Sequence, residues 1–298
     1  MPRITHAPRR LAAALLTAAT GLTFLPGVAA AAPTGPAPTA EARAAGVQPG
    51  NATMGWRQQA TSGGRAPLSA QAEGAAGAPS SKAAPQEAFV PSGVLGIDVS
   101  SWQGTVNWTA QVGTGKRFAY VKATEGTRYK NPYFGAQYTG SYRAGMIRGA
   151  YHFATPSSSS GTTQAAFFAR NGGGWSADGR TLPGVLDIEY NPYGATCYGL
   201  SQASMVAWVR SFTTEYKRLT RRDAVIYTTT DWWTRCTGNS TAFSRTNPLW
   251  LARYATAPGT LPGGWTWATF WQYTSVPIDQ NRFSSSYARL VVLARDAG

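Results

Sequence analysis

From residue 94 onward, short apolar segments of strand character alternate with segments of helix character. This alternation predicts a largely parallel sheet, because parallel strands are joined by crossover helices. Seven or eight strands in so short a chain fit a closed barrel better than an open doubly wound sheet. The last strands follow one another with little helix between them, so we expect an α/β fold: an irregular single-domain (β/α) barrel, TIM-barrel-like. The expected strands cover 94–100, 118–124, 147–154, 184–189, 224–230, 248–254 and 267–273, and the expected helices cover 131–145, 162–171 and 201–222.

The helix expected over 201–222 has the clearest signals. Ser201 is a suitable N-cap, and basic residues occupy the last turn, where they complement the helix dipole. For the helix over 162–171, Thr162 or Thr163 is the expected cap. The apolar residues of the longer helix repeat on one face: Met205, Trp208, Val209, Phe212, Tyr216 and Leu219.

The first 32 residues have the features of a secretory signal peptide. Arg3, Arg9 and Arg10 precede an apolar run, which ends in small residues that allow cleavage after Ala30 or Ala32. A membrane anchor fits less well, because Thr and Gly interrupt the run and no basic stop-transfer block follows. We therefore expect a secreted, extracellular protein with no membrane attachment after cleavage. The Arg9-Arg10 pair leaves general and twin-arginine export both open.

Residues 33–92 are rich in Ala, Gly, Pro, Ser and Gln and contain almost no large aliphatic side chains. Such a composition predicts a disordered linker or pro-segment, because little apolar surface is available to offset the entropy of ordering. The composition changes at Val94. Ten of the eleven Trp residues lie between Trp102 and Trp271, and only Trp56 lies outside. We therefore assign residues 93–298 to one catalytic β/α barrel.

The chain is strongly basic, with a formal net charge of +14. From residue 91 on, 20 Lys and Arg residues face 10 Asp and Glu residues. A secreted basic protein is attracted to anionic surfaces such as bacterial cell walls, nucleic acid or acidic lipids. The alternative is that the excess charge only aids solubility. The basic residues are scattered rather than gathered in one stripe, which disfavours a nucleic-acid partner.

Cysteine and histidine usage narrows the chemistry. Cys197 and Cys236 are the two cysteines, and an even pair in an exported protein predicts a disulfide. Apart from His6 in the signal peptide, His152 is the one histidine, which excludes a zinc site built on histidines. We also find no glycine-rich nucleotide motif, so we expect no cofactor and no metal.

The stretch LPGVLDIEYNP (182–192) places two acids on a strand that otherwise belongs in a core. Side chains alternate along a strand, so Asp187 and Glu189 share one face, with Cα atoms about 6.6 Å apart. Two carboxylates held this close raise the pKa of one of them, which then stays protonated as an acid. Glycoside hydrolysis requires such a pair. A divalent-metal site or an ion pair with Arg are the alternatives that the pair alone leaves open.

Six segments in order resemble glycoside hydrolase family 25, the Chalaropsis-type lysozymes or N-acetylmuramidases. They are GIDVSSWQGTVNW, KATEGTRYKNPYF, GAYHFA, LDIEYN, PLWLARY and FWQYTS…IDQNRF, and they span residues 94–283. The resemblance implies an irregular β/α barrel. It also implies hydrolysis of the β-1,4 bond between N-acetylmuramic acid and N-acetylglucosamine in bacterial peptidoglycan.

The same resemblance assigns roles to individual residues. It implies that Glu189 is the general acid and Asp187 its partner, which either orients the substrate's acetamido group or activates water. The other residues that it implies in the site are the acids Asp98 and Asp279, the cleft tyrosines Tyr151 and Tyr227, and the further candidates Tyr254 and Trp271. His152 alternates away from Tyr151, so we expect it to be a packed residue. We expect Glu125 to anchor its loop, with Lys122 pairing with it or with a site acid.

Two other functions fit parts of the pattern. One is hydrolysis of another N-acetylated glycan, such as chitin; the other is a barrel that binds cell walls without catalysis. A metal-dependent hydrolase is a third reading, which insensitivity to chelators would remove. The full set of acids argues against a barrel without catalysis and favours a lysozyme that acts on peptidoglycan. We expect this protein to be a monomer.

Overall fold

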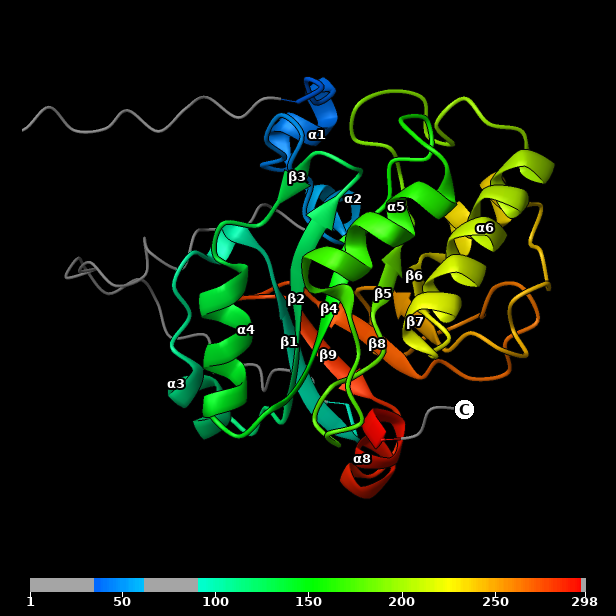
Figure 1. The fold of residues 1–298 in the computed structure, drawn as a ribbon. Helices are drawn as coiled ribbons and strands as arrows, with labels where there is room; N and C mark the ends of the chain where they lie inside the picture. Colours follow the sequence, from blue (N-terminus) through cyan, green and yellow to red (C-terminus); the bar gives the residue numbers. More distant parts are fainter. Residues whose placement is uncertain (1–34, 62–90, 296–298) are drawn as a thin grey trace, which may run out of the picture. The chain divides into compact units, whose positions relative to one another are not determined.

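The structure, a computed structural model, describes residues 35–61 and 91–295. The expected signal peptide, residues 1–32, lies outside the described residues, as do residues 62–90 of the expected linker. Within the described residues, eight strands close into a barrel in the order β1-β9-β8-β7-β6-β5-β4-β2, and β2 pairs back with β1 (Figure 1). The barrel strands are β1 (Val94–Val99), β2 (Phe118–Glu125), β4 (Ile147–Phe153), β5 (Val185–Asp187), β6 (Val225–Thr228), β7 (Leu249–Ala252), β8 (Phe270–Thr274) and β9 (Gln280–Phe283).

The barrel is irregular, as the sequence predicts, and the irregularity lies at its closure. β9 runs antiparallel to both of its neighbours, β8 and β1, whereas the other barrel pairs are parallel. Strand β9 is not predicted by the sequence pattern, because four residues after a turn carry little periodicity. A further short strand, β3 (Tyr129–Lys130), forms a hairpin with the end of β2.

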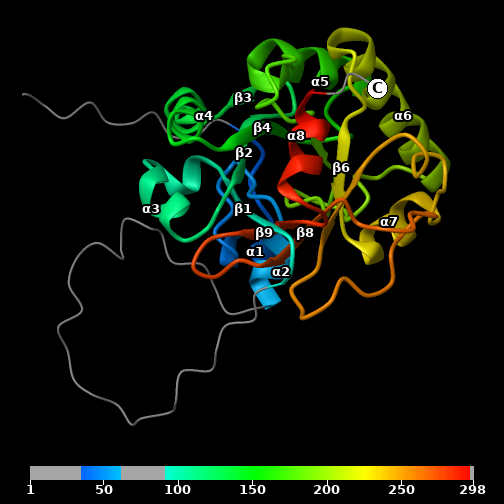
Figure 2. The ribbon, with the colours of Figure 1, turned by 90° about the horizontal axis from the view of Figure 1, so that it is seen from below.

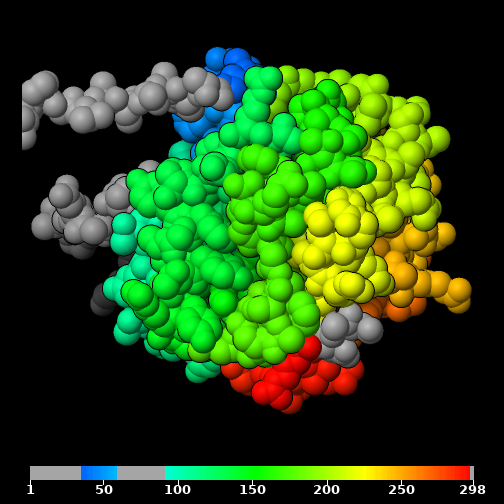
Figure 3. Space-filling view, viewed as in Figure 1, coloured from blue at the N-terminus to red at the C-terminus, as the bar shows by residue number. Residues whose placement is uncertain are grey.

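Helices cover the outside of the barrel, and in the space-filling view they hide the strands on that side (Figure 3). Ser201 caps α6 by accepting the Ser204 N–H, as expected, whereas α5 is capped by Ser160 rather than by Thr162 or Thr163. Leu219 was expected on the buried face of α6 but is 39% exposed in the last turn. The helices that follow β1 are η2 (Ser101–Gln103), α3 (Trp108–Gly113), α4 (Phe134–Arg143), α5 (Gly161–Phe168), the π-turn η3 (Ala169–Gly173), α6 (Gln202–Thr220), α7 (Thr230–Thr237) and α8 (Tyr287–Arg295).

Two apolar layers hold the barrel together, one inside it and one between the strands and the helices. The C-terminal helix α8 contributes Leu290 and Ala294 to the inner layer, and Figure 2 shows it crossing the lower end of the barrel. The inner layer includes Phe118, Tyr120, Tyr151, Val185, Val225, Tyr227, Trp250 and Phe270. The outer layer includes Phe153, Phe168, Leu186, Ile188, Met205, Phe212, Ile226 and Leu251. Among the described residues, no helix is long and apolar enough to cross a membrane.

Residues 35–61 differ from the expected disordered linker. They form the short helices α1 (Ala40–Ala44) and α2 (Trp56–Thr61) and pack against the barrel. The reason is that the few apolar side chains of this segment, although sparse in sequence, are buried together in the apolar layers of the barrel. They are Ala42, Val47, Ala52, Met54 and Trp56, each 2% exposed or less.

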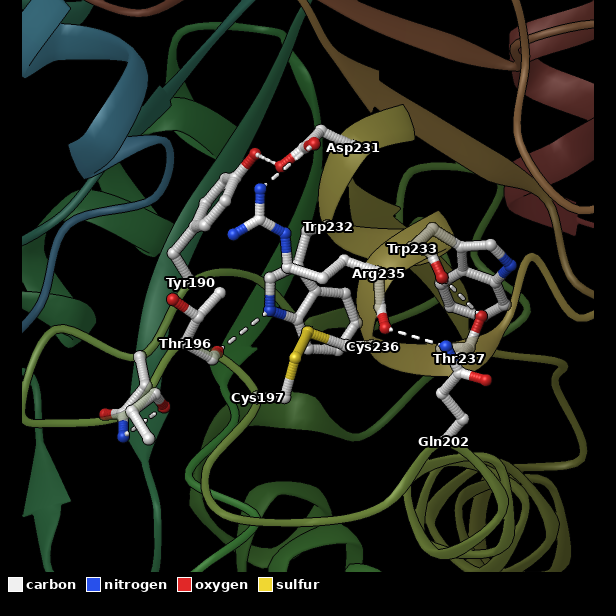
Figure 4. The surroundings of a disulfide bond; sticks show 12 residues. Tyr190, Thr196, Cys197, Gln202, Asp231, Trp232, Trp233, Arg235, Cys236 and Thr237 are labelled. Atoms are coloured by element: carbon white, nitrogen blue, oxygen red, sulfur yellow. Dashed lines mark hydrogen bonds and ion pairs between the residues drawn. A yellow bond between two sulfur atoms is a disulfide. The ribbon is translucent and has the colours of Figure 1, made fainter.

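The predicted disulfide between Cys197 and Cys236 is confirmed, with Cα atoms 5.3 Å apart. It joins the loop after β5 to α7 (Figure 4). Nearby, the indole N–H of Trp232 donates to the carbonyl of Thr196, 3.2 Å away. The bridge and this hydrogen bond therefore fix the loop that follows the acidic strand.

We expect the double substitution Cys197→Ala with Cys236→Ala to lower the free energy of unfolding by about 4 kcal/mol, the chain-entropy value for a loop of this length. The measurement is urea denaturation of the oxidised native protein and the variant. Native protein unfolded in a reducing agent serves as the control and should match the variant. A difference below about 1 kcal/mol would contradict the role assigned to the bridge.

Candidate active site

Three carboxylates converge on the inside of the barrel. Asp187 is the last residue of β5, Glu189 follows two positions later, and Asp98 lies near the end of β1. Val185 belongs to the inner layer and Leu186 to the outer layer, so alternation turns Asp187 and Glu189 inward. All three are at most 1% exposed. The shared face expected for Asp187 and Glu189 is therefore present.

Amide groups hold Asp98 in place. Its Oδ2 accepts hydrogen bonds from Gln272 Nε2 at 2.9 Å and from Asn281 Nδ2 at 2.7 Å. Asp279, which is 2% exposed, precedes β9, and its carbonyl accepts the Asp98 N–H at 3.4 Å. The antiparallel strand β9 thus brings Asp279 and Asn281 to Asp98, and its Asn281 was not anticipated from the sequence.

Asp187 and Glu189 are held in a way that favours their protonated forms. Burial raises the pKa of Asp187 well above its usual value, and the neighbouring Glu189 carboxylate raises it further. Among the described residues, no N–H or hydroxyl group donates to either carboxylate oxygen of Asp187, so its hydrogen-bonding neighbour is the Glu189 carboxyl. Burial also raises the pKa of Glu189, to about 8, although the Gly55 N–H opposes this by donating to Oε1 at 2.5 Å. A carboxyl that still holds its proton at neutral pH can act as a general acid.

A buried cation lies beside these acids. Lys122 Nζ is 2.5 Å from Glu125 Oε2, and both side chains are at most 3% exposed. The Tyr193 hydroxyl donates to the other oxygen of Glu125. Burial lowers the pKa of Lys122, while Glu125, Asp187 and Glu189 favour its charged form. Glu125 therefore anchors its surroundings through Lys122, as expected.

The structure brings three of the four predicted aromatic residues into the barrel interior or to the acids. The hydroxyls of Tyr227 and Tyr254 approach the same atom, Gln272 Oε1, at 2.7 and 3.2 Å. Tyr151 lies in the inner layer, 1% exposed. Trp271 is different: it lies on the other face of β8 from Gln272, and its indole N–H donates to the Arg253 carbonyl. The structure therefore does not bring Trp271 to the acids.

Comparisons with known proteins assign the chain to a family. Residues 97–281 match the model of Glycosyl hydrolases family 25. This chain belongs to glycosyl hydrolase family 25. It is 46% identical to Lysozyme M1 of Streptomyces globisporus over 294 residues, covering 95% of this chain and 92% of that protein. It is also 52% identical to an N,O-diacetylmuramidase of Chalaropsis sp over 183 residues, covering 60% of this chain and 87% of that protein.

Solved structures agree with the family assignment. The crystal structure of the bacterial lysozyme from Streptomyces coelicolor has a TM-score of 0.68 and 52% identity, covering 70% of this chain and 99% of that chain. The lysozyme of this family from Aspergillus fumigatus has a TM-score of 0.68 and 51% identity, covering 69% of this chain and 100% of that chain. The family resemblance read from the six segments is confirmed, and the chain is a glycoside hydrolase.

His152 is a packed residue of the family 25 barrel, as expected from alternation. Its Nδ1 is 2.8 Å from Thr124 Oγ1 and its Nε2 is 3.0 Å from Gln164 Oε1. The ring stacks near Phe168 and Phe212, and burial lowers its pKa to about 4. His152 is therefore neutral at neutral pH. Within residues 35–61 and 91–295, no group of three or more His, Cys, Asp or Glu is arranged to hold a metal ion.

Sequence reasoning missed the amides Gln272 and Asn281 and the contacts from residues 51–58. Gln272 directly follows Trp271, and Asn281 lies two positions after Asp279, but an amide gives no charge signal of its own. For residues 51–58 the available signal was Trp56, the one Trp outside the barrel. Its indole N–H donates to the Tyr190 carbonyl at 2.9 Å, one residue after Glu189.

The raised pKa of Glu189 predicts how stability depends on pH. The folded chain keeps a proton up to about pH 8 that the unfolded chain releases near pH 4.5, so the free energy of unfolding should fall as pH rises between these values. We expect Glu189→Gln to abolish this decrease in the free energy of unfolding. Between pH 5 and 8 the variant should therefore become more stable than the native protein by a few kcal/mol, at about 1.4 kcal/mol per pKa unit.

Urea denaturation of both proteins at pH 5, 6, 7 and 8 measures this difference. Glu215→Gln is the matched control. Arg218 lowers the pKa of the Glu215 carboxyl, which is therefore ionised in both the folded and the unfolded chain at these pH values. The difference in free energy of unfolding between this variant and the native protein should stay constant from pH 5 to 8. A constant difference for Glu189→Gln as well would contradict the raised pKa.

Proposed function

We propose that this chain is a secreted N-acetylmuramidase. It hydrolyses the β-1,4 bond between N-acetylmuramic acid and N-acetylglucosamine in bacterial peptidoglycan. The observation that carries the proposal is the buried pair Asp187 and Glu189, in which the pKa of Glu189 is raised to about 8. The names of the relatives, a lysozyme and an N,O-diacetylmuramidase, support the substrate class.

In the proposed reaction, Glu189 gives its proton to the oxygen of the leaving sugar as the glycosidic bond breaks. Asp187 then has one of two roles. It either orients the substrate's own acetamido group, whose oxygen attacks the anomeric carbon, or, once it has released its own proton, accepts a proton from the water that attacks there. Asp98, held by Gln272 and Asn281, supplies a fixed negative charge close to both acids.

The configuration of the first product distinguishes the two roles of Asp187. Attack by the acetamido oxygen followed by water retains the anomeric configuration, whereas direct attack by water inverts it. Proton NMR of a soluble glycan fragment during the first minutes of hydrolysis, before mutarotation, reads this directly.

Secretion and attraction to the wall are part of the proposal. The basic and apolar pattern of residues 1–32 supports export. The net charge of +14 supports attraction to an anionic wall polymer, and this attraction should weaken as salt rises.

We expect Glu189→Gln to lower the rate of peptidoglycan hydrolysis by at least about 100-fold, the usual contribution of a general acid. Purified peptidoglycan is digested, the new ends are reduced with borohydride, and the products are identified by mass spectrometry. Glu215→Gln, a change of a half-buried carboxylate that pairs with Arg218 on the outer helix α6, serves as the control and should keep full activity. Retention of more than a few per cent of the activity by Glu189→Gln would refute its role as the acid.

The identity of the reduced ends tests the bond assignment separately. Reduced muramic acid ends support a muramidase, whereas reduced glucosamine ends would overturn the bond and leave a hydrolase of another linkage. Wall binding without any new ends would favour a barrel that binds peptidoglycan without cleaving it.

A further inference from the structure

Residues 51–58 of the N-terminal segment lie directly on the candidate active site. The Gly55 N–H donates to Glu189 Oε1 at 2.5 Å, and the Ala52 N–H donates to Glu125 Oε2 at 2.7 Å. Lys122 Nζ donates to the Ala52 carbonyl and, at 3.1 Å, to Asn51 Oδ1. The backbone of this segment therefore donates hydrogen bonds to the proposed general acid and to Glu125 of the buried ion pair, and it accepts one from Lys122 of that pair.

The backbone at Gly55 packs so closely around the acids that a side chain has no room there. Gly55 has φ +69°, in the left-handed region that favours glycine. A Cβ atom there would lie 2.7 Å from Gln272 Oε1, 2.8 Å from the Tyr227 hydroxyl and 2.9 Å from the Tyr254 hydroxyl. Because the Gly55 N–H also contacts Glu189, Gly55 lies between this carboxyl and the three polar side chains, where a sugar that reacts at Glu189 would need to approach.

Apolar side chains fix the segment on both sides of Gly55. Met54 is fully buried in the inner layer of the barrel, and Trp56 is 2% exposed in the outer layer. Gln58 Nε2 donates to the Ala252 carbonyl at 3.2 Å. In Figure 1 the blue helices α1 and α2 lie at the upper end of the barrel, where β2 ends.

We propose that residues 35–61 are an inhibitory segment that closes the active site and must leave before a glycan chain can bind. The proposal rests on the proposed function, because it concerns the same acids. With the segment bound, Asp98, Asp187 and Glu189 are at most 1% exposed, so neither a sugar nor the attacking water reaches them.

The comparisons support a barrel that folds without this segment. The described barrel, residues 91–295, is 205 of 298 residues, or about 69% of the chain. The structures from Streptomyces coelicolor and Aspergillus fumigatus match 70% and 69% of this chain over 99% and 100% of their own length. These solved chains therefore have the size of the barrel alone.

Lysozyme M1 shares more than the barrel. Its alignment covers 95% of this chain, which leaves about 15 of the 298 residues outside. Residues 35–61 are 27 residues, so the alignment includes at least part of them. The segment is therefore shared by a relative that carries the name of an active enzyme.

The first test uses the chain from residue 33 to its end. Gly55→Val places a branched side chain against Gln272, Tyr227 and Tyr254, which should push the segment out. Ala44→Val adds the same bulk at an exposed position of α1 and is the matched control. We expect Gly55→Val to hydrolyse peptidoglycan at least tenfold faster than the native chain and Ala44→Val. Equal rates in all three active proteins would overturn the inhibitory role and leave the muramidase proposal standing.

A binding measurement separates the two proposals. In chains that also carry Glu189→Gln, a soluble peptidoglycan tetrasaccharide should bind at least tenfold more tightly when Gly55→Val is present. If it does, yet no chain hydrolyses peptidoglycan, the segment still blocks the site and the proposed function fails. Affinity that is the same with and without Gly55→Val, including no binding in either, would overturn the inhibitory role.

A second test breaks the covalent link instead of the contacts. A recognition sequence for a site-specific protease is placed between residues 61 and 91, and the cut segment is separated from the barrel. Loss of the tether removes the high effective concentration of the segment at the site, so activity should rise at least tenfold. A synthetic peptide of residues 35–61 should restore inhibition. The same peptide with Gly55→Val should need at least a tenfold higher concentration for the same inhibition. A native peptide without effect on the cut barrel would refute the proposal.

Discussion

The site depends on burying several carboxylates inside a closed barrel where few positive groups reach them. Asp98, Glu125, Asp187 and Glu189 are at most 4% exposed. An ionised carboxylate in such surroundings is costly unless it is paired or hydrogen-bonded. The hydrogen bonds and ion pairs that offset this free-energy cost differ from one acid to the next, and these differences indicate which acids hold a proton.

Asp98 and Glu125 each accept hydrogen bonds from two or more donors, whereas Glu189 accepts one from the Gly55 N–H and Asp187 accepts none from an N–H or hydroxyl of the described residues. Asp98 accepts two amide hydrogen bonds, and Glu125 accepts from Lys122, Tyr193 and the Ala52 N–H. Asp187 lacks such donors among the described residues, and burial raises its pKa. Protons rather than counter-ions thus balance the pair on β5, which is the state an acid catalyst needs before its substrate arrives.

The sequence predicts the inward pair well because its signal is local. Alternation along five residues places Asp187 and Glu189 on one face, and the flanking Val185, Leu186 and Ile188 mark the inner and outer layers. The closure of the barrel is a different matter. Asn281 reaches Asp98 because β9 runs antiparallel between β8 and β1, a pairing across about 180 residues that no local pattern encodes. Trp271 was misplaced for a related reason, since its role depended on which face of β8 looks inward.

The N-terminal segment is a second case in which contacts distant in sequence decide a structure that the local sequence does not predict. Composition predicts disorder for residues 33–92 because it weighs the segment alone, whereas Met54 and Trp56 are buried against surfaces that the barrel provides. Buried carboxyl oxygens inside an apolar barrel favour a chain that brings N–H groups and apolar side chains together. The Gly55 N–H and its two neighbours supply both. The burial that raises the pKa values of Asp187 and Glu189 therefore also makes their surroundings a binding site for a segment of the chain itself, and the proposed inhibition follows from the same physical property as the proposed acid catalysis.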